Sequence, residues 1–357
     1  MGESAHNLLL AIAWGLLLVF TGLAVVGVIA LVGIRAARQA TSRRRQRDRG
    51  AIRSRIVAAI VDEGDAAAEA DRELMALRGT AWDHAEAAVI AMLPKVRGDA
   101  QERLRTVLRT RGTEQRALAQ ARSLRAFVRC KGAFALGVLR STDAVDRLIV
   151  LLDDRSALVR RVAVRSLGQI GDARAVEPLL ALAARDLGLT RDIVFALHEI
   201  GLSGAPALRA AVGSWQPDFR ADDRPAALAA SALGMIQDVD ASLVLADAVL
   251  RGPIALRLAA AKALGHLDTP LSLAPLQAAL RAPSHQVRVA AAASLGRLGA
   301  EVAIPALVDV MRSTDSATAR AAADALMELG PAGRAALESS GAPHAIEALA
   351  LHRLRSG

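Results

Sequence analysis

The stretch SLGQIGDARAVEPLL (residues 166–180) places two glycines and a proline between apolar runs, and related copies of it recur along the chain. Aligning the sequence on an Ala-Leu or Ser-Leu pair and the residue that follows gives matches at Gly137, Gly168, His198, Gly234, Gly265, Gly296 and Met327. Successive matches lie 31, 30, 36, 31, 31 and 31 residues apart. Self-similarity at a nearly fixed period in this range indicates a solenoid, in which repeated units stack on one another.

Each unit has the apolar pattern of two helices. Residues 172–183 carry apolar side chains at the i, i+3, i+4 and i+7 positions of one helix face, with Asp172 placed as the N-cap. The preceding helix is expected to begin after Ser156, its N-cap, and to end at Gly171. No segment here alternates with a period of two for long enough to form a strand, so we predict an all-α fold.

The whole chain divides into five predicted segments. They are a single transmembrane helix (1–34), an Arg-rich juxtamembrane segment (35–55), a divergent helical region (56–115), an α-solenoid of about seven helical hairpins (116–340) and a C-terminal capping helix (341–357).

The repeats resemble the HEAT repeat family, in particular its short bacterial units of the phycobilisome-lyase type. The resemblance rests on three copies, VRRVAVRSLGQIGDARAVEPLLAL (159–182), LRLAAAKALGHLDTPLSLAPLQAAL (256–280) and VRVAAAASLGRLGAEVAIPALVDVM (287–311). It covers about residues 115–340 and implies hairpins that bury their apolar faces against their neighbours. This resemblance is specific for the fold and says little about function.

Three activities known among HEAT-like proteins find little support in the residues. Deoxyhypusine hydroxylases bind two irons through several His-Glu pairs, whereas this chain has one such pair, His198-Glu199. Bilin lyases need a tetrapyrrole pocket, which no motif marks. HEAT-like DNA glycosylases need a basic surface, but residues 56–357 contain 36 basic and 34 acidic side chains. We therefore expect no enzyme activity, cofactor, metal, nucleic acid or small-molecule substrate, with a bilin-lyase-like or other HEAT-like enzyme as the alternative.

Residues 8–34 form a run of 27 residues with no ionisable side chain. About 20 apolar residues suffice for a helix to cross the hydrocarbon core of a bilayer. A cleaved signal peptide would have a basic start and a shorter apolar core, and the N-myristoylation motif needs Ser or Thr where this chain has His6. The pattern favours a retained single-pass anchor.

Arginines follow the apolar run immediately. Residues 35–55 contain nine arginines and one acid, and residues 1–34 contain no Lys or Arg. This asymmetry predicts an inner (cytoplasmic) membrane protein with its N-terminus outside and its solenoid in the cytoplasm. We expect the first seven of these arginines to contact anionic lipid headgroups, namely Arg35, Arg38, Arg43, Arg44, Arg45, Arg47 and Arg49.

The repeats also carry arginines at two nearly equivalent positions of the second helix of each hairpin. Arg129, Arg160, Arg257 and Arg288 precede the aligned residue by eight positions, and Arg191 and Arg320 precede it by seven. One hypothesis is a strip along the inner face that binds acidic groups of a protein partner. The alternative is that each arginine pairs with an acid of a neighbouring unit, such as Asp153, Asp154 or Asp309, and bridges the layers.

Few aromatic residues are available for a binding site, since they make up 2% of the chain. Trp215 and Phe219 lie in an insertion (213–223), where they are candidate contacts for a protein partner. The alternative is that they fold back and cover a gap between layers.

Cys130 lies between Phe127 and Phe134 and is interpreted as a small buried apolar residue.

These observations predict a membrane-anchored, cytosolic HEAT-like scaffold or adaptor that binds a membrane-associated protein. It would be accessory to a bacterial membrane or envelope complex.

Overall fold

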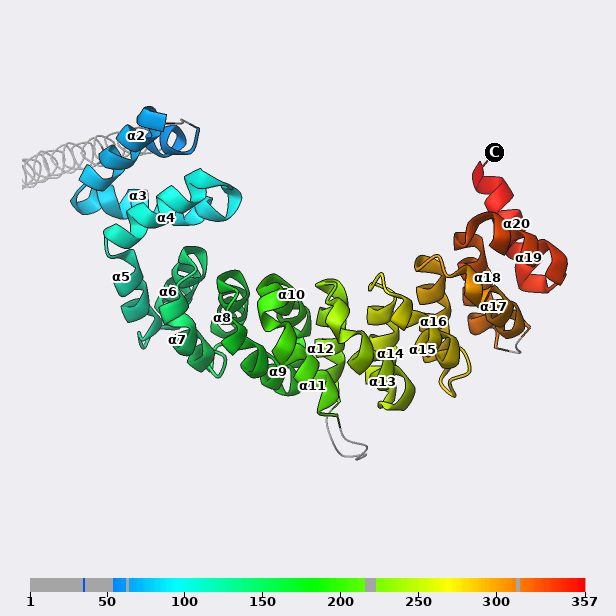
Figure 1. The fold of residues 1–357 in the computed structure, drawn as a ribbon. Helices are drawn as coiled ribbons and strands as arrows, with labels where there is room; N and C mark the ends of the chain where they lie inside the picture. The colour runs from blue at the N-terminus through cyan, green and yellow to red at the C-terminus, as the bar shows by residue number, and fades with distance from the viewer. Residues whose placement is uncertain (1–34, 36–53, 62–63, 216–222, 313–314, 357) are drawn as a thin grey trace, which may run out of the picture. The chain divides into compact units, whose positions relative to one another are not determined.

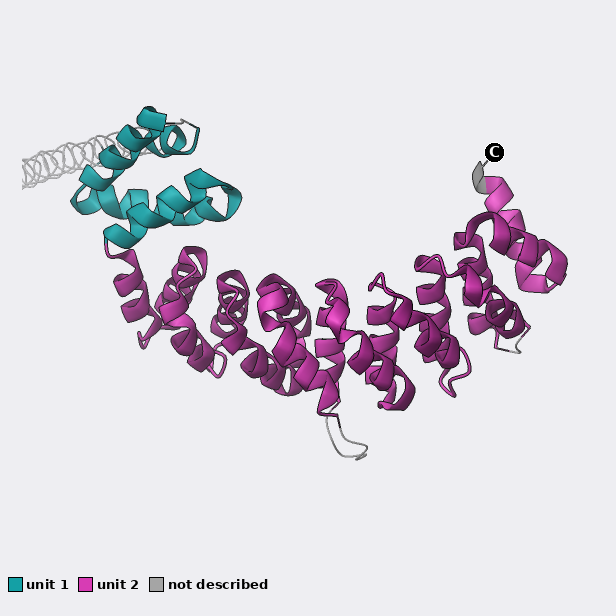
Figure 2. Ribbon diagram, in the orientation of Figure 1, with its two compact units in different colours: residues 1–111 teal, residues 112–357 magenta. Residues whose placement is uncertain are grey.

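A computed structural model of the chain describes residues 35, 54–61, 64–215, 223–312 and 315–356 (Figure 1). All regular elements in these ranges are helical. The chain divides into two compact units, residues 1–111 and 112–357 (Figure 2). No helix within the described ranges is both long enough and apolar enough to cross a membrane. The predicted anchor (1–34) and the predicted Arg-rich segment, except Arg35 and residues 54–55, lie outside the described residues.

The first unit contains three α-helices after a helical segment at residues 54–61. They are α2 (Gly64–Ala76), α3 (Gly79–Met92) and α4 (Asp99–Thr110), with the 3-10 turn η1 (Leu93–Lys95) between the last two. Trp82 is buried, and the guanidinium of Arg111 lies 4.4 Å from the centre of its ring. The same arginine donates a hydrogen bond of 2.7 Å to the main-chain oxygen of Leu77. These contacts hold α3 against the end of α4.

The second unit is a stack of helical hairpins, each with an A helix followed by a B helix. The A helices are α5 (Thr113–Ala121), α7 (Val145–Leu151), α9 (Val176–Arg185), α11 (Ala205–Gly213), α13 (Ser242–Arg251), α15 (Leu273–Ala279), α17 (Ile304–Met311) and α19 (Gly330–Ser340). The B helices are α6 (Ala126–Leu139), α8 (Ala157–Ile170), α10 (Thr190–Ile200), α12 (Arg224–Met235), α14 (Ile254–Leu264), α16 (His285–Arg297), α18 (Ser316–Glu328) and α20 (Pro343–Ser356). The row of hairpins curves, and the B helices lie along its inner side (Figure 1).

Short 3-10 turns lead into most of the A helices. They are η2 (Thr142–Ala144), η3 (Ala173–Ala175), η5 (Gly201–Gly204), η6 (Val239–Ala241), η7 (Pro270–Ser272) and η8 (Glu301–Ala303), while η4 (Leu187–Leu189) precedes the B helix α10. The Asp172 carboxylate accepts a hydrogen bond of 2.9 Å from the Arg174 backbone N–H, which confirms Asp172 as a cap. Gly171, at φ +79°, ends α8 as predicted.

The predicted cap at Ser156 is correct in position but not in chemistry. Ser156 is the N-cap residue of α8, yet its side chain makes no capping hydrogen bond. Instead, the Asp154 carboxylate accepts a hydrogen bond of 2.9 Å from the Ser156 backbone N–H. The aspartate two residues earlier thus accepts the N–H of the cap residue itself, and not the N–H of the second or third helical residue that a serine hydroxyl would accept.

The aligned glycines explain the repeat, because each lies against the next B helix. A Cβ atom placed on Gly168 would be 2.7 Å from Cα of Ala196, too close for any real contact. Gly137, Gly234, Gly265 and Gly296 face small residues of the next B helix in the same way, namely Ser166, Ala263, Ser294 and Ala325. The two serines also hydrogen-bond across the layers, Ser166 to Ala133 at 2.8 Å and Ser294 to Ala261 at 2.9 Å. The glycines thus permit a close approach of neighbouring B helices.

The stack is interrupted where the aligned residue is His198. Here α10 and α12 contact each other less extensively than α8 and α10 or α12 and α14 do. The insertion between α11 and α12 falls in the same layer, and its residues 216–222 lie outside the described part of the chain. The loss of the glycine and the longer connection therefore coincide.

Replacing Gly168 with alanine tests the close packing. The added methyl group forces α8 and α10 apart, so we expect the free energy of unfolding to fall by about 1–3 kcal/mol. Urea unfolding followed by circular dichroism measures the change. Gly213→Ala is the matched control, because its Cβ would meet only Val244 at an ordinary 3.6 Å. Equal stability of Gly168→Ala and the parent would contradict the proposed role of the glycine.

Candidate functional site

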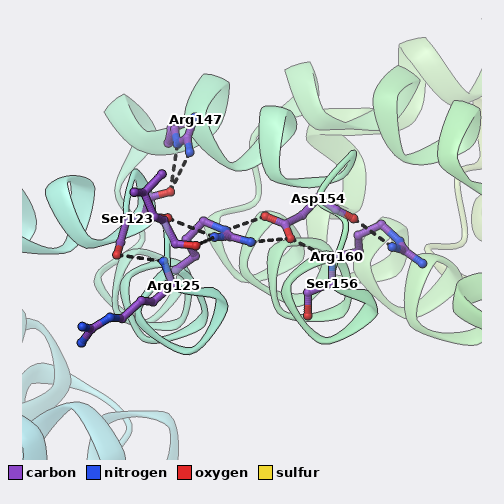
Figure 3. Close-up of polar contacts among 9 residues, drawn as sticks. Ser123, Arg125, Arg147, Asp154, Ser156 and Arg160 are labelled. Carbon is purple, nitrogen blue, oxygen red and sulfur yellow. Dashed lines mark hydrogen bonds and ion pairs between the residues drawn. The ribbon is translucent and has the colours of Figure 1, made fainter.

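The six arginines predicted to form one strip occupy two structurally different positions. Arg129, Arg160 and Arg288 each form an ion pair with an aspartate of the next layer. Arg129 binds Asp154 through two hydrogen bonds of 2.6 and 2.8 Å (Figure 3). Arg160 Nη2 lies 2.8 Å from Asp186, and Arg288 Nη2 lies 2.8 Å from Asp315. These three arginines therefore bridge the layers, which is the structural alternative that the sequence left open.

Each of these arginines also binds the loop that precedes its own helix. Arg129 donates to the main-chain oxygens of Ser123 (3.0 Å) and Leu124 (2.8 Å). Arg160 donates to the main-chain oxygen of Asp154 at 2.9 Å, as Figure 3 shows. Arg288 makes the equivalent bonds to the oxygens of residues 282 and 283. One guanidinium thus joins its own loop to the next layer.

The aspartates have two roles as well. Asp154, Asp186 and Asp315 each accept a backbone N–H two residues later, at the start of the next helical segment. The hydrogen bonds from Arg129 lower the pKa of Asp154 below its ordinary value. The Thr318 hydroxyl and then the Arg288 guanidinium lower the pKa of Asp315 to about 2. Both carboxylates are thereby held in the ionised form that the bridges need.

The other three arginines make no such bridge to a loop aspartate. Arg257 has the same helix position, but the residues 25–27 positions further on are Ala282, Pro283 and Ser284, none of them an aspartate. Its Nε donates to the Val249 oxygen at 3.0 Å instead. Arg320 Nη2 lies 3.5 Å from Glu347 in α20. Arg191 is exposed and forms no ion pair with a described residue. The six arginines therefore do not form the single row predicted from the sequence. Arg191 and Arg320 are displaced because a shift of one residue turns a helix position by about 100°, and Arg257 lacks an aspartate partner.

The acids named as possible partners also differ in their contacts. Asp154 pairs with Arg129, as described above. Asp153 pairs with Arg185 at 2.6 Å, and both side chains are exposed. Asp309 is exposed and has no ion pair within the described part of the chain.

The structure describes only one of the two candidate aromatic residues in the insertion. Trp215 is half-buried and lines a cavity of about 550 Å³ together with residues of α9, α11 and the start of α12. Phe219 lies outside the described residues. Of the predicted lipid-contacting arginines, Arg35 is exposed and helical, and the other six also lie outside the described residues.

The sequence reasoning missed three exposed phenylalanines. Phe127, Phe134 and Phe195 lie on α6 and α10 with exposed fractions of 79%, 40% and 56%. The interpretation of Cys130 as a small buried apolar residue is wrong, since Cys130 is half-buried and Phe127 and Phe134 on either side of it are exposed. Burial and then the Asp154 charge raise the pKa of the Cys130 thiol. Alignment of the repeats could have found this, because Phe134 corresponds to Arg165 and Lys262, both exposed.

Residues suited to metal binding are dispersed. His198 and Glu199 are both exposed on α10. Over the described ranges, no three or more His, Cys, Asp or Glu side chains come together in a way that could hold a metal ion.

The pH dependence of stability tests the Arg288–Asp315 bridge. A carboxylate has a pKa of about 3.9 in an unfolded chain, so ionised Asp315 stabilises the fold fully above that pH and loses its effect as the pH falls toward 2. We expect Asp315→Asn to be less stable than the parent at pH 7, and the difference to vanish near pH 2. Urea unfolding at each pH measures it.

Asp309→Asn is the control for that experiment, because Asp309 is an exposed acid of the same layer. The free energy of unfolding of Asp309→Asn is expected to equal that of the parent at every pH. A difference between Asp315→Asn and the parent that stays constant down to pH 2 would show that the carboxylate charge does not stabilise the bridge.

Known proteins share this architecture. HEAT repeats match residues 115–198, 244–327 and 273–350, which together make up more than half of the chain. No curated protein was found to match it. The solved complex of CpcE and CpcF of phycocyanin lyase from Nostoc sp. PCC7120 is similar, with 25% identity over 67% of this chain and 92% of that chain and a TM-score of 0.32.

Two other solved structures are similar at lower identity. Human deoxyhypusine hydroxylase shares 18% identity over 80% of this chain and 97% of its own, with a TM-score of 0.31. The karyopherin Kap121p, bound to the extreme C-terminus of the protein phosphatase Cdc14p, shares 13% identity over 83% and 41%, with a TM-score of 0.44. The stacked hairpins and the match over more than half of the sequence show that the chain belongs to the HEAT repeat family.

Proposed function

We propose that this protein is a non-enzymatic scaffold or adaptor that binds another protein through the inner face of its HEAT repeats. The observation that carries the proposal is the stack itself. Close contacts at the glycines and the Arg–Asp bridges hold the layers together, and the inner side of the B helices retains exposed side chains. Solenoids of this kind provide extended concave surfaces for recognition.

We also propose that residues 8–34 anchor the scaffold in the inner membrane of a bacterium, with the repeats in the cytoplasm. The support is the run of 27 residues without an ionisable side chain, followed by nine arginines within residues 35–55. Each arginine near the surface would contribute about 1 kcal/mol of attraction to anionic lipids. Such an anchor would raise the effective concentration of the scaffold near membrane-associated partners.

Cell fractionation tests the anchor. The full-length chain is expected to sediment with membranes and to stay there in alkaline carbonate, because an inserted helix resists washing, whereas a purely electrostatic contact does not. Removing residues 8–34 is expected to release the protein, and replacing the seven arginines from Arg35 to Arg49 with glutamine leaves it in the carbonate-resistant pellet. Full-length protein in the carbonate supernatant would contradict the anchor.

Crosslinking in intact cells tests the scaffold itself. Chemically crosslinked full-length protein is purified under denaturing conditions, and the captured proteins are identified by mass spectrometry. The proposal predicts a small, reproducible set of membrane-associated proteins. A captured set no different from that of an unrelated membrane protein of equal abundance would contradict it, as would a tetrapyrrole or metal that co-purifies in stoichiometric amount.

A further inference from the structure

The described phenylalanines are all on the surface, although the chain has few aromatic residues and no tyrosine. Phe127, Phe134 and Phe195 are exposed, whereas the buried core of the repeats is built from Ala, Leu, Val and Ile with one methionine. Phenylalanine offers more apolar area for burial than most of these core residues. In the free protein, the apolar area of these three side chains therefore does not contribute to the core.

These phenylalanines belong to one patch on three consecutive B helices. Phe127, Leu158 and Leu187 lie near the starts of α6, α8 and α10, and their exposed fractions are 79%, 58% and 67%. Phe134 and Phe195 lie about two turns further along α6 and α10, so these two helices each display two apolar groups roughly 10 Å apart. On α8 the equivalent second position is occupied by Arg165. Since packed neighbouring helices are also separated by about 8–10 Å, the five apolar groups form a grid on the inner side of the stack with one position filled by an arginine.

Basic side chains fill the space between the apolar groups. Lys131, Arg161, Arg165 and Arg191 are exposed on the same stripe of α6, α8 and α10. The neighbouring acid Asp192 pairs with two of them, Arg161 at 3.2 Å and Arg165 at 3.0 Å. Asp192 is half-buried, and Glu199 at the far end of α10 is an exposed acid on the same stripe. We call the five apolar and four basic residues of this grid the aromatic–basic surface.

We propose that the aromatic–basic surface binds an acidic segment of a partner protein that carries large apolar side chains between its Asp and Glu residues. This inference rests on the proposed scaffold function and gives it a location and a partner chemistry. The apolar side chains of the partner cover the phenylalanines and leucines, and its carboxylates pair with the lysine and the arginines. Charge complementarity of this kind selects the partner and its register.

Two other occupants fit less well. A second copy of this chain, docked through the same face, would bring the basic residues of both copies together. A flat bilayer would match the charge and the apolar groups, but α6, α8 and α10 lie on the inner side of the curved row of helices (Figure 1), and a flat surface does not reach that side.

Site-specific photo-crosslinking in cells tests the proposal. A benzophenone amino acid is placed in the full-length chain at Phe127 or Phe195, at Lys262 on the inner side of α14, or at Leu243 on α13 as an outer control. We expect Phe127 and Phe195 to crosslink the same protein, within a segment that contains more Asp and Glu than Lys and Arg. Leu243 is expected to give no such product.

The other results overturn the proposal in distinguishable ways. A protein captured from Lys262 but not from Phe127 or Phe195 overturns the location and leaves the scaffold function intact. No captured protein from any inner position overturns both. The surface has a different occupant if the crosslinked product is a lipid, another part of the chain, a second copy or a basic segment of a partner. Each of these products contradicts the proposal.

Charge reversal separates binding from folding. With the benzophenone at Leu158, we expect Lys131→Glu/Arg191→Glu to lower the crosslinking yield at least about tenfold, since charge pairs in contact each contribute strongly to affinity. Neither side chain bridges two layers, so thermal unfolding is expected to stay unchanged. Arg281→Glu/Arg312→Glu, which reverses two exposed charges outside this surface, is the matched control. Equal yields from both double variants would contradict the proposed charge pairing.

Discussion

The structure depends on how closely neighbouring B helices approach each other. At Gly168 the next helix lies so near that even a methyl group would collide with the Ala196 backbone. A single hairpin has too little apolar surface to fold alone, so its stability comes from the contacts with its neighbours. Because these contacts need a small residue, the sequence repeats the glycine 31 residues apart at Gly137 and Gly168, and again at Gly234, Gly265 and Gly296.

The Arg–Asp bridges fix the spacing of neighbouring layers at their edge. Arg160 binds the loop before its own helix and the aspartate that caps the next helical segment, so it fixes the spacing of two layers at their edge. On the inner side of α6, α8 and α10, Arg161 and Arg165 also pair with Asp192 of the next layer, whereas Lys131 and Arg191 form no ion pair with a described residue. A division of this kind, with one set of positions for stacking and another for recognition, lets a repeat protein change its partner without losing its fold.

The sequence was sufficient to predict the stack but not the surface. The glycine period, the Asp172 cap and the helix end at Gly171 follow from local rules, and the structure confirms them. The partners of Arg160 and Arg288 come from loops 26 and 27 residues further on, and this offset cannot be read from one helix. The exposure of Phe127 was missed because it depends on which side of α6 meets the next layer, and the residue type alone does not show this.

Native-state hydrogen exchange on Arg160→Met tests the central claim that stability is transmitted only between adjacent layers. The substitution removes the bridge from α8 to the loop before α10 and keeps much of the side-chain volume. We expect the protected amides in α8 and α10 to exchange faster, and the exchange rates in α16 and α18 to stay unchanged. Equal acceleration in all four helices, or none in α8 and α10, would contradict it.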